Sequence, residues 1–146
     1  MKVLVDTNVI LDVLLDRAPF VDASSELLAR VERGEVEGCV CATTVTTIHY
    51  LAGKVVGAAQ ARTAISRLLS ILGVAAVNRP VIEAALESPL TDFEDAVLLE
   101  AGRAEDVRSI VTRNPADFAR GDLPVHTPAE LLAILHPAAP LPLGDR

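Results

Sequence analysis

Short runs of aliphatic and β-branched residues alternate with longer helical patterns along the chain, and this alternation constrains the fold more than any other feature. Continuous apolar runs are typical of strands that are covered on both faces. Strands that alternate with helices predict βαβ units, right-handed crossovers and a mostly parallel sheet. The expected strands cover residues 2–5, 40–42, 74–77, 109–111 and 124–126, and the expected helices cover 20–31, 43–52, 58–72, 81–86, 92–104 and 128–135.

A chain of 146 residues is long enough to form one domain with a sizeable core. We expect this domain over residues 1–136, followed by a Pro-rich tail over 137–146. No apolar run reaches the length of a membrane span. Met1 and Lys2 lead directly into a strand-like segment rather than a signal peptide, so we expect a cytoplasmic protein.

The net charge of −7 argues against a purely electrostatic nucleic-acid binder, which would normally be basic. It leaves a nuclease open, because a carboxylate cluster that binds Mg²⁺ would account for part of the negative charge. The two cysteines, Cys39 and Cys41, alternate within one apolar run and would point to the same face of a strand. We interpret them as small buried thiols in a reducing compartment.

The first motif with a chemical interpretation is Val3-Leu4-Val5-Asp6-Thr7-Asn8, in which a buried strand ends on an acid and a helix follows. Ligands of open α/β sheets bind beyond the carboxyl ends of the strands, so Asp6 is expected where a ligand would bind. The structural alternative is that Asp6 caps the helix that follows. Asn8 can orient a water or a substrate oxygen, or can hydrogen-bond the loop.

The second motif is Asp92-Phe93-Glu94-Asp95-Ala96. Asp92 and Asp95 are three residues apart and share one face of the expected helix. Their mutual repulsion is offset in part by the positive end of the helix, and a divalent cation would offset it further. The alternative interpretation is a solvated, acid-rich start of a helix.

The third motif runs from Ile110 to Phe118, where a strand leads into a polar loop. Thr112 and Asn114 can hydrogen-bond this loop or a metal-bound water. Asp117 is either a further carboxylate of the site or a turn residue, and Arg113 is either a phosphate contact or a solvated side chain. Because adjacent parallel strands would bring the three motifs together, we expect a divalent metal site at one edge of the sheet.

With these motifs the chain resembles PIN-domain proteins, the group that includes VapC-type toxin ribonucleases. The resemblance covers nearly everything from residue 1 to residue 136 and rests on VLVDTNVILD, DFEDAVLLEAG, VTRNPADF and PVHTPAELL. It implies a three-layer α/β/α fold with a central, mostly parallel sheet of four or five strands. It also implies that a carboxylate cluster binds Mg²⁺ or Mn²⁺ and that an activated water cleaves the RNA. Carried over by position, Asp6 and Asp95 are the metal ligands, Asp92 is an accessory carboxylate, and Asn114 and Asp117 lie at the last polar motif.

The sequence departs from the family pattern at two positions. Thr47 stands where the family usually has Glu, and Asn114 stands where many members have Asp. The cluster therefore carries fewer charges, which is consistent with weaker metal affinity, a single metal, a shifted ligand set or lost catalysis. His49 is either a substitute base or a histidine at the helix surface or the edge of the core.

The function expected first is a metal-dependent endoribonuclease, the toxin of a type II toxin–antitoxin module. The resemblance also implies an RNA substrate, a small antitoxin partner and a homodimer. The alternative from another class is a non-catalytic PIN-like module that binds RNA or protein. A third interpretation, a phosphohydrolase with Asp6 as nucleophile, is weakened because Asn8 stands where such enzymes have a second Asp.

Overall fold

A computed structural model describes residues 1–135, so His136 and the expected tail over 137–146 lie outside the described residues. Within residues 1–135, five parallel strands form one sheet in the order β3-β2-β1-β4-β5. The strands are β1 (Lys2–Val5), β2 (Glu37–Cys41), β3 (Gly73–Ala75), β4 (Ser109–Val111) and β5 (Val125–His126). The helices are α1 (Thr7–Leu14), α2 (Val21–Glu32), α3 (Ala42–Val56), α4 (Ala58–Leu69), α5 (Arg79–Leu86), α6 (Phe93–Ala104), the 3₁₀ helix η1 (Pro115–Phe118) and α7 (Pro128–Leu135).

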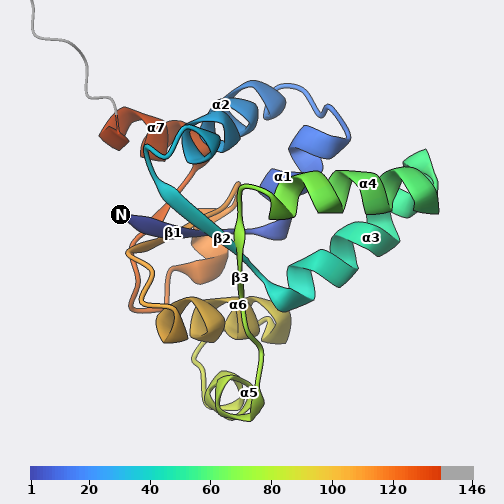
Figure 1. The fold of residues 1–146 in the computed structure, drawn as a ribbon. Helices are drawn as coiled ribbons and strands as arrows, with labels where there is room; N and C mark the ends of the chain where they lie inside the picture. The colour runs from blue at the N-terminus through green and yellow to red at the C-terminus, as the bar shows by residue number, and fades with distance from the viewer. Residues whose placement is uncertain (136–146) are drawn as a thin grey trace, which may run out of the picture.

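The sheet is covered on both faces, as the apolar runs predict. Figure 1 shows α1, α2, α3, α4 and α7 on one side of the strands and α5 and α6 on the other. Successive strand residues point to opposite faces, so Val3 and Val5 join one core cluster while Leu4 joins the other. The predicted three-layer α/β/α fold with a parallel sheet is confirmed.

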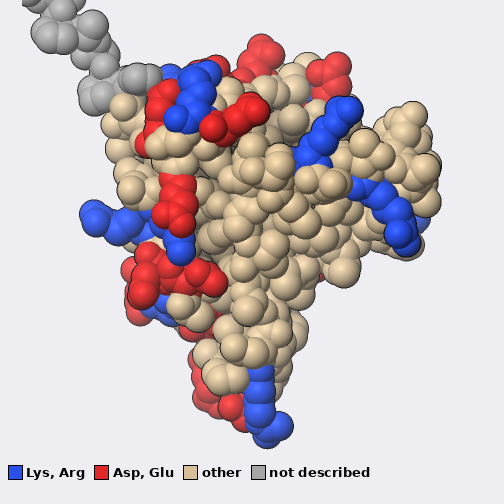
Figure 2. All heavy atoms as spheres, viewed as in Figure 1, with Lys and Arg blue, Asp and Glu red and all other residues tan. Residues whose placement is uncertain are grey.

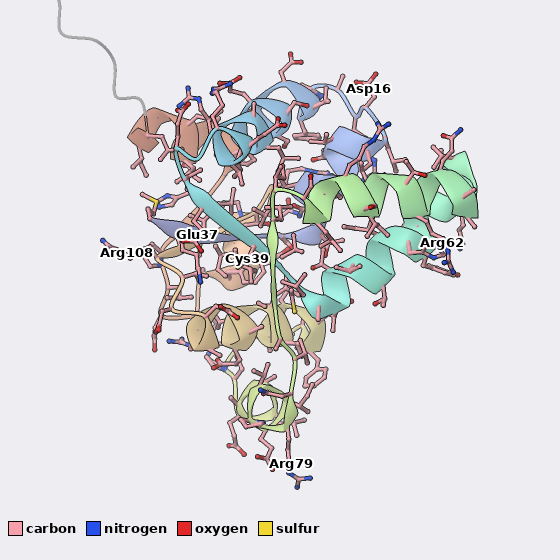
Figure 3. All side chains as sticks on the ribbon, viewed as in Figure 1. Asp16, Glu37, Cys39, Arg62, Arg79 and Arg108 are labelled. Atoms are coloured by element: carbon pink, nitrogen blue, oxygen red, sulfur yellow. The ribbon has the colours of Figure 1, made fainter. Side chains whose placement is uncertain are left out.

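The cysteines occupy β2, where Figure 3 labels Cys39. Cys39 and Cys41 are free thiols, both are buried, and both belong to the core cluster under α5 and α6. Burial raises the pKa of Cys39 to about 11, which keeps this thiol protonated at neutral pH. The two residues are therefore core thiols, as predicted.

Several element boundaries differ from the predicted ones for local reasons. The helix predicted over 81–86 begins earlier, at Arg79, because the side chain of Asn78 caps it by accepting a hydrogen bond from the amide of Val81 at 3.2 Å. The helix predicted over 43–52 runs on to Val56 and ends at Gly57, whose φ of +91° suits glycine. In the described part of the chain, no helix has the length and apolar character needed to cross a bilayer.

The topology brings the candidate motifs to one edge. Strand β1 lies between β2 and β4, and the amide of Asp6, just past β1, donates to the carbonyl of Val111 at the end of β4. All strands are parallel, so their carboxyl ends meet at the same edge of the sheet. Asp6 and the loop after Val111 are therefore neighbours although more than 100 residues separate them in sequence.

Candidate active site

Asp6 lies at the carboxyl end of β1, and its side chain is held at both oxygens. One oxygen accepts the amide of Thr7 at 2.7 Å, so Asp6 is the N-cap of α1. The other accepts the hydroxyl of Thr112 at 2.7 Å. With 7 % of its surface exposed, Asp6 is buried. The capping alternative considered from the sequence is therefore realised, and it still leaves a carboxylate at the edge of the sheet.

Thr112 is the centre of a hydrogen-bond network at the end of β4. Its fully buried hydroxyl donates to Asp6 and accepts from the side-chain amide of Asn8 at 3.3 Å and the backbone amide of Asn114 at 3.1 Å. Asn8 in turn accepts the amide of Arg113 at 3.1 Å. Of the two roles considered for Asn8, the described contacts are those of a residue that orders the loop.

The start of α6 carries the next two carboxylates. Asp92 is the N-cap, and its side chain accepts the amide of Asp95 at 3.0 Å. Asp92 is exposed, whereas Asp95 is partly buried. The apolar face of α6, including Val97 and Leu98, anchors the helix in the core, so its N-terminus is presented at the edge of the sheet.

Burial and mutual repulsion both act on these carboxylates. Burial, followed by repulsion from Asp92, Asp6, Asp117 and Glu94, raises the pKa of Asp95 to about 7. Burial also raises the pKa of Asp6, against the hydrogen bonds from Thr112 and Thr7 that stabilise its charged form. No ion pair within residues 1–135 involves any of these five carboxylates. Their negative charge is therefore uncompensated by protein groups at salt-bridge distance.

A cavity of about 190 Å³ opens between the start of α6 and η1. Asp92, Asp95 and Asp117 all line it, so the structure brings Asp117 to the acidic cluster. Arg120 also lines this cavity, and no sequence motif pointed to it. The cavity supplies space beside the carboxylates, which a bound ion or a phosphate would need.

Three other candidate residues do not line the acidic cavity. Asn114 is exposed, and its side chain makes no hydrogen bond to the described residues. The hydroxyl of Thr47 donates to the carbonyl of Thr43 at 3.1 Å, one turn back along α3. His49 is not among the residues that line the acidic cavity, and its Nε2 is buried without a hydrogen-bond partner in the described part of the chain. The last observation agrees with a histidine at the edge of the core.

The donor chemistry of the cluster suits a hard divalent cation, since carboxylate oxygens are the ligands that Mg²⁺ and Mn²⁺ prefer. Residues 1–135 hold no group of three or more His, Cys, Asp or Glu side chains arranged to bind a metal ion. Mg²⁺ does not require such a cage, because it keeps several waters and binds through one or two carboxylates. The residues present therefore fit an ion held by one or two direct ligands.

The sequence interpretation missed the partner of Arg113. This guanidinium makes a bidentate pair with Asp12 on α1, with Nε–Oδ2 at 3.0 Å and Nη2–Oδ1 at 2.7 Å. It also lies over the ring of Phe20, 4.2 Å from the centroid. Both alternatives considered for Arg113, a phosphate contact or a solvated side chain, overlook this pair. The available signal was Asp12 itself, an acid within the apolar helical run Val9-Ile10-Leu11.

Comparison with known proteins identifies the family. The model of the PIN domain matches residues 2–116. A search of curated proteins finds no match. Among solved structures, the chain is similar to VapBC2 from Rickettsia felis bound to a promoter DNA fragment, with a TM-score of 0.67, 17 % identity, and coverage of 87 % of this chain and 98 % of that chain.

Two further structures are similar to the same extent. A toxin–antitoxin complex from Klebsiella pneumoniae aligns with a TM-score of 0.65 and 22 % identity over 86 % of this chain and 97 % of that chain. VapC20 from Mycobacterium tuberculosis is a toxin that cleaves the Sarcin-Ricin loop. It aligns with a TM-score of 0.66 and 16 % identity over 82 % of this chain and 95 % of that chain. The family-model match and the shared fold together show that this chain belongs to the PIN-domain family and has the fold of VapC-type toxins.

Proposed function

We propose that this protein is a metal-dependent endoribonuclease that cleaves RNA phosphodiester bonds, and that it is the toxin of a type II toxin–antitoxin module. The observation that carries the proposal is that Asp6 and Asp95 lie at the carboxyl edge of a PIN-domain sheet without an ion-pair partner in residues 1–135, and that repulsion from Asp6 helps to raise the pKa of Asp95. The similarity to toxins in complex with antitoxins supports the biological role.

In this proposal Asp6 and Asp95 hold Mg²⁺ or Mn²⁺. When bound, such an ion lowers the pKa of a water and stabilises the charge that develops on a transferring phosphate. Asp92 and Asp117 contribute negative charge from the walls of the adjoining cavity, and Asn114, directly before η1, offers an exposed amide. Thr112 and the amide of Thr7 orient Asp6, so this carboxylate is pre-positioned.

The net charge of −7 and the acidic cluster repel an RNA substrate at long range. Figure 2 shows Lys and Arg side chains separated from one another on the face that it presents. Arg62, Arg79 and Arg108 lie at separate extremities of the molecule (Figure 3). Productive binding is therefore proposed to depend on the cation and on local contacts such as Arg120 more than on long-range attraction.

The proposed partners are an RNA substrate, a small antitoxin and a second copy of the chain, in the cytoplasm. The antitoxin proposal is supported by the neighbours that are toxin–antitoxin complexes. The homodimer and the cytoplasmic location come from the resemblance and the sequence pattern alone. Size-exclusion chromatography with light scattering would measure the oligomeric state directly.

The proposal is tested by incubating the purified protein with a panel of structured RNAs in Mg²⁺ or Mn²⁺. We expect cleavage that EDTA stops and that Asp6→Asn and Asp95→Asn abolish. Asp22→Asn, an exposed acid in the first turn of α2, is the matched control and should cleave normally. Full cleavage by both site variants would refute the proposal, as would an absence of metal-dependent cleavage across the panel.

A non-catalytic PIN-like module that binds RNA or protein is the second candidate. It is favoured by Thr47, whose hydroxyl bonds its own helix where the family pattern expects a Glu, and by the absence of a three-ligand group in residues 1–135. Calorimetric titration of the wild-type protein with Mn²⁺ separates the two candidates. Binding that Asp95→Asn removes supports the nuclease, and no binding supports the module.

A further inference from the structure

A second cavity is lined by Arg113, from the loop that follows β4. It measures about 220 Å³ and is formed between the segment that joins α1 to α2, the start of α2 and the start of α7. Pockets for drug-sized ligands typically measure about 300–1,000 Å³, so this one has room for a single flat ring system. The residues that matter here are Asp12, Phe20, Ser24, Arg113 and Ala129.

Two polar groups of this cavity lack partners within the described residues. Arg113 uses Nε and Nη2 on Asp12, which leaves the donors of Nη1 without a hydrogen bond. Ser24 lines the cavity and is only 1 % exposed, yet its hydroxyl makes no hydrogen bond within residues 1–135. The Ser24 hydroxyl and the Nη1 donors can therefore hydrogen-bond an occupant of the cavity that offers acceptors.

The charge and the walls of the cavity select for a neutral, flat occupant. The charge of Arg113 is balanced by Asp12 in the same wall, so the lining does not favour an anion such as phosphate. The remaining walls are largely apolar and include Phe20, which is 37 % exposed, together with two prolines and two alanines. Nucleobases stack on aromatic rings and guanidinium planes. Arg113 covers one face of Phe20, so a base would stack on an outer face of this pair.

A hydrogen-bond network also links the lining of this cavity to the acidic site. Arg113 follows Thr112, whose hydroxyl donates to Asp6, and the amide of Arg113 donates to Asn8 in the same network. Consecutive Cα atoms are about 3.8 Å apart, so the residue that bonds Asp6 directly precedes a residue that lines this cavity. A strand of RNA with a phosphate at the carboxylates would have a neighbouring base within reach of the cavity.

We propose that this cavity is a nucleobase subsite that selects the RNA sequence beside the cleaved bond. The inference rests on the proposed ribonuclease function. The free donors of Arg113 Nη1 and Ser24 favour bases with carbonyl acceptors, so uracil, cytosine and guanine bind better than adenine, which lacks a carbonyl.

The test uses the full ¹⁵N-labelled chain without metal, titrated with uridine, cytidine or adenosine and followed by NMR. We expect uridine and cytidine, more than adenosine, to shift the amides of residues 20–24, 113 and 127–129. Ala129→Leu places a larger side chain in the cavity and should weaken uridine binding by about tenfold or more. Ala133→Leu, one turn further along α7 and exposed outside the cavity, is the matched control and should bind like wild type.

Nucleoside binding without metal does not depend on catalysis, so the two proposals can fail separately. No uridine-dependent shift at the cavity, or equal binding by wild type and Ala129→Leu, overturns the subsite even if RNA is cleaved. Nucleoside binding without cleavage of any RNA refutes the ribonuclease and keeps the cavity as a base-binding site. If Ala129→Leu fails to fold, Ser24→Ala replaces it and should lose the preference for uridine over adenosine. A cavity that instead binds a protein partner and no nucleoside also overturns the subsite.

Discussion

Two buried aspartates from one short segment of the chain, Asp6 and Asp12, have opposite surroundings. Asp12 lies beside two arginines, Arg113 in a bidentate pair and Arg17 at 3.8 Å. Within residues 1–135, Asp6 has only a hydroxyl and an amide as hydrogen-bond partners, and the carboxylates of Glu94 and Asp117 repel its charge. The comparison separates an acid whose charge is balanced inside the fold from one that has no ion-pair partner in residues 1–135.

The largest expected contrast is in stability. Asp12→Asn leaves the guanidinium of Arg113 without its carboxylate, and breaking a buried pair in this way costs about 3 kcal/mol at the low end of the usual range. The low end applies because the side chain of Arg113 is 29 % exposed. Asp6→Asn should change the free energy of unfolding by less than about 1 kcal/mol, because Asn retains the helix cap and removes a buried charge, which offsets the loss of one of the two acceptor oxygens. Urea unfolding of both variants measures the difference, and equal losses would remove the distinction between the two acids.

A smaller effect is expected at Thr112, which orients Asp6 without adding charge. Thr112→Val keeps the shape of the side chain and removes the hydroxyl that donates to Asp6. Removing a partner that orients a metal ligand typically lowers activity or metal affinity about 10- to 100-fold. Thr112→Ser, which retains the hydroxyl, should recover most of the loss. The measurement is Mn²⁺ affinity by calorimetry together with the rate of RNA cleavage, and a Val variant equal to wild type would contradict the assigned role.

The smallest expected effect is a pH dependence of metal-free stability, because Asp95 is only partly buried and solvent screens the repulsion that acts on it. The pKa of Asp95 is about 7 in the folded state against an ordinary value of 3.8, so the folded protein holds this proton more tightly than the unfolded chain. Stability should therefore fall as pH rises from about 4 to about 7 and change little from this group above that. The raised pKa of Asp6 acts in the same direction.

Thermal melts in EDTA from pH 5 to pH 8 provide this measurement, with Asp95→Asn as the variant that lacks the titrating group. We expect a flatter pH profile for the variant, and we expect Mn²⁺ to restore the melting temperature of the wild type at pH 8. If the melting temperatures of the two proteins changed with pH in the same way, the pKa of Asp95 would not be raised by its acidic neighbours.

The sequence predicts the parts of this molecule that depend on local pattern. The doubly covered parallel sheet follows from the apolar runs, and the positions of Asp6 and Asp95 at one edge follow from strand ends and helix starts. The PIN-domain resemblance agrees with the family match over residues 2–116. The role of each acid as a ligand stays a prediction.

The pairing of Asp12 with Arg113 could not be read from local pattern, because it depends on which face of α1 meets the end of β4. The two residues are 101 positions apart, and only the adjacency of β1 and β4 brings them together. The second cavity is hidden for the same reason, since its walls come from α1, α2, the β4 loop and α7.

The hydrogen bonds to Asp6 also limit the stereochemistry of anything that binds it. Each carboxylate oxygen has two lone pairs, and Thr7 and Thr112 occupy one lone pair on each. One lone pair per oxygen stays available, in directions set by the fold rather than by rotation of the side chain. The entropy of fixing this rotamer is therefore lost when the protein folds and not again when a ligand arrives.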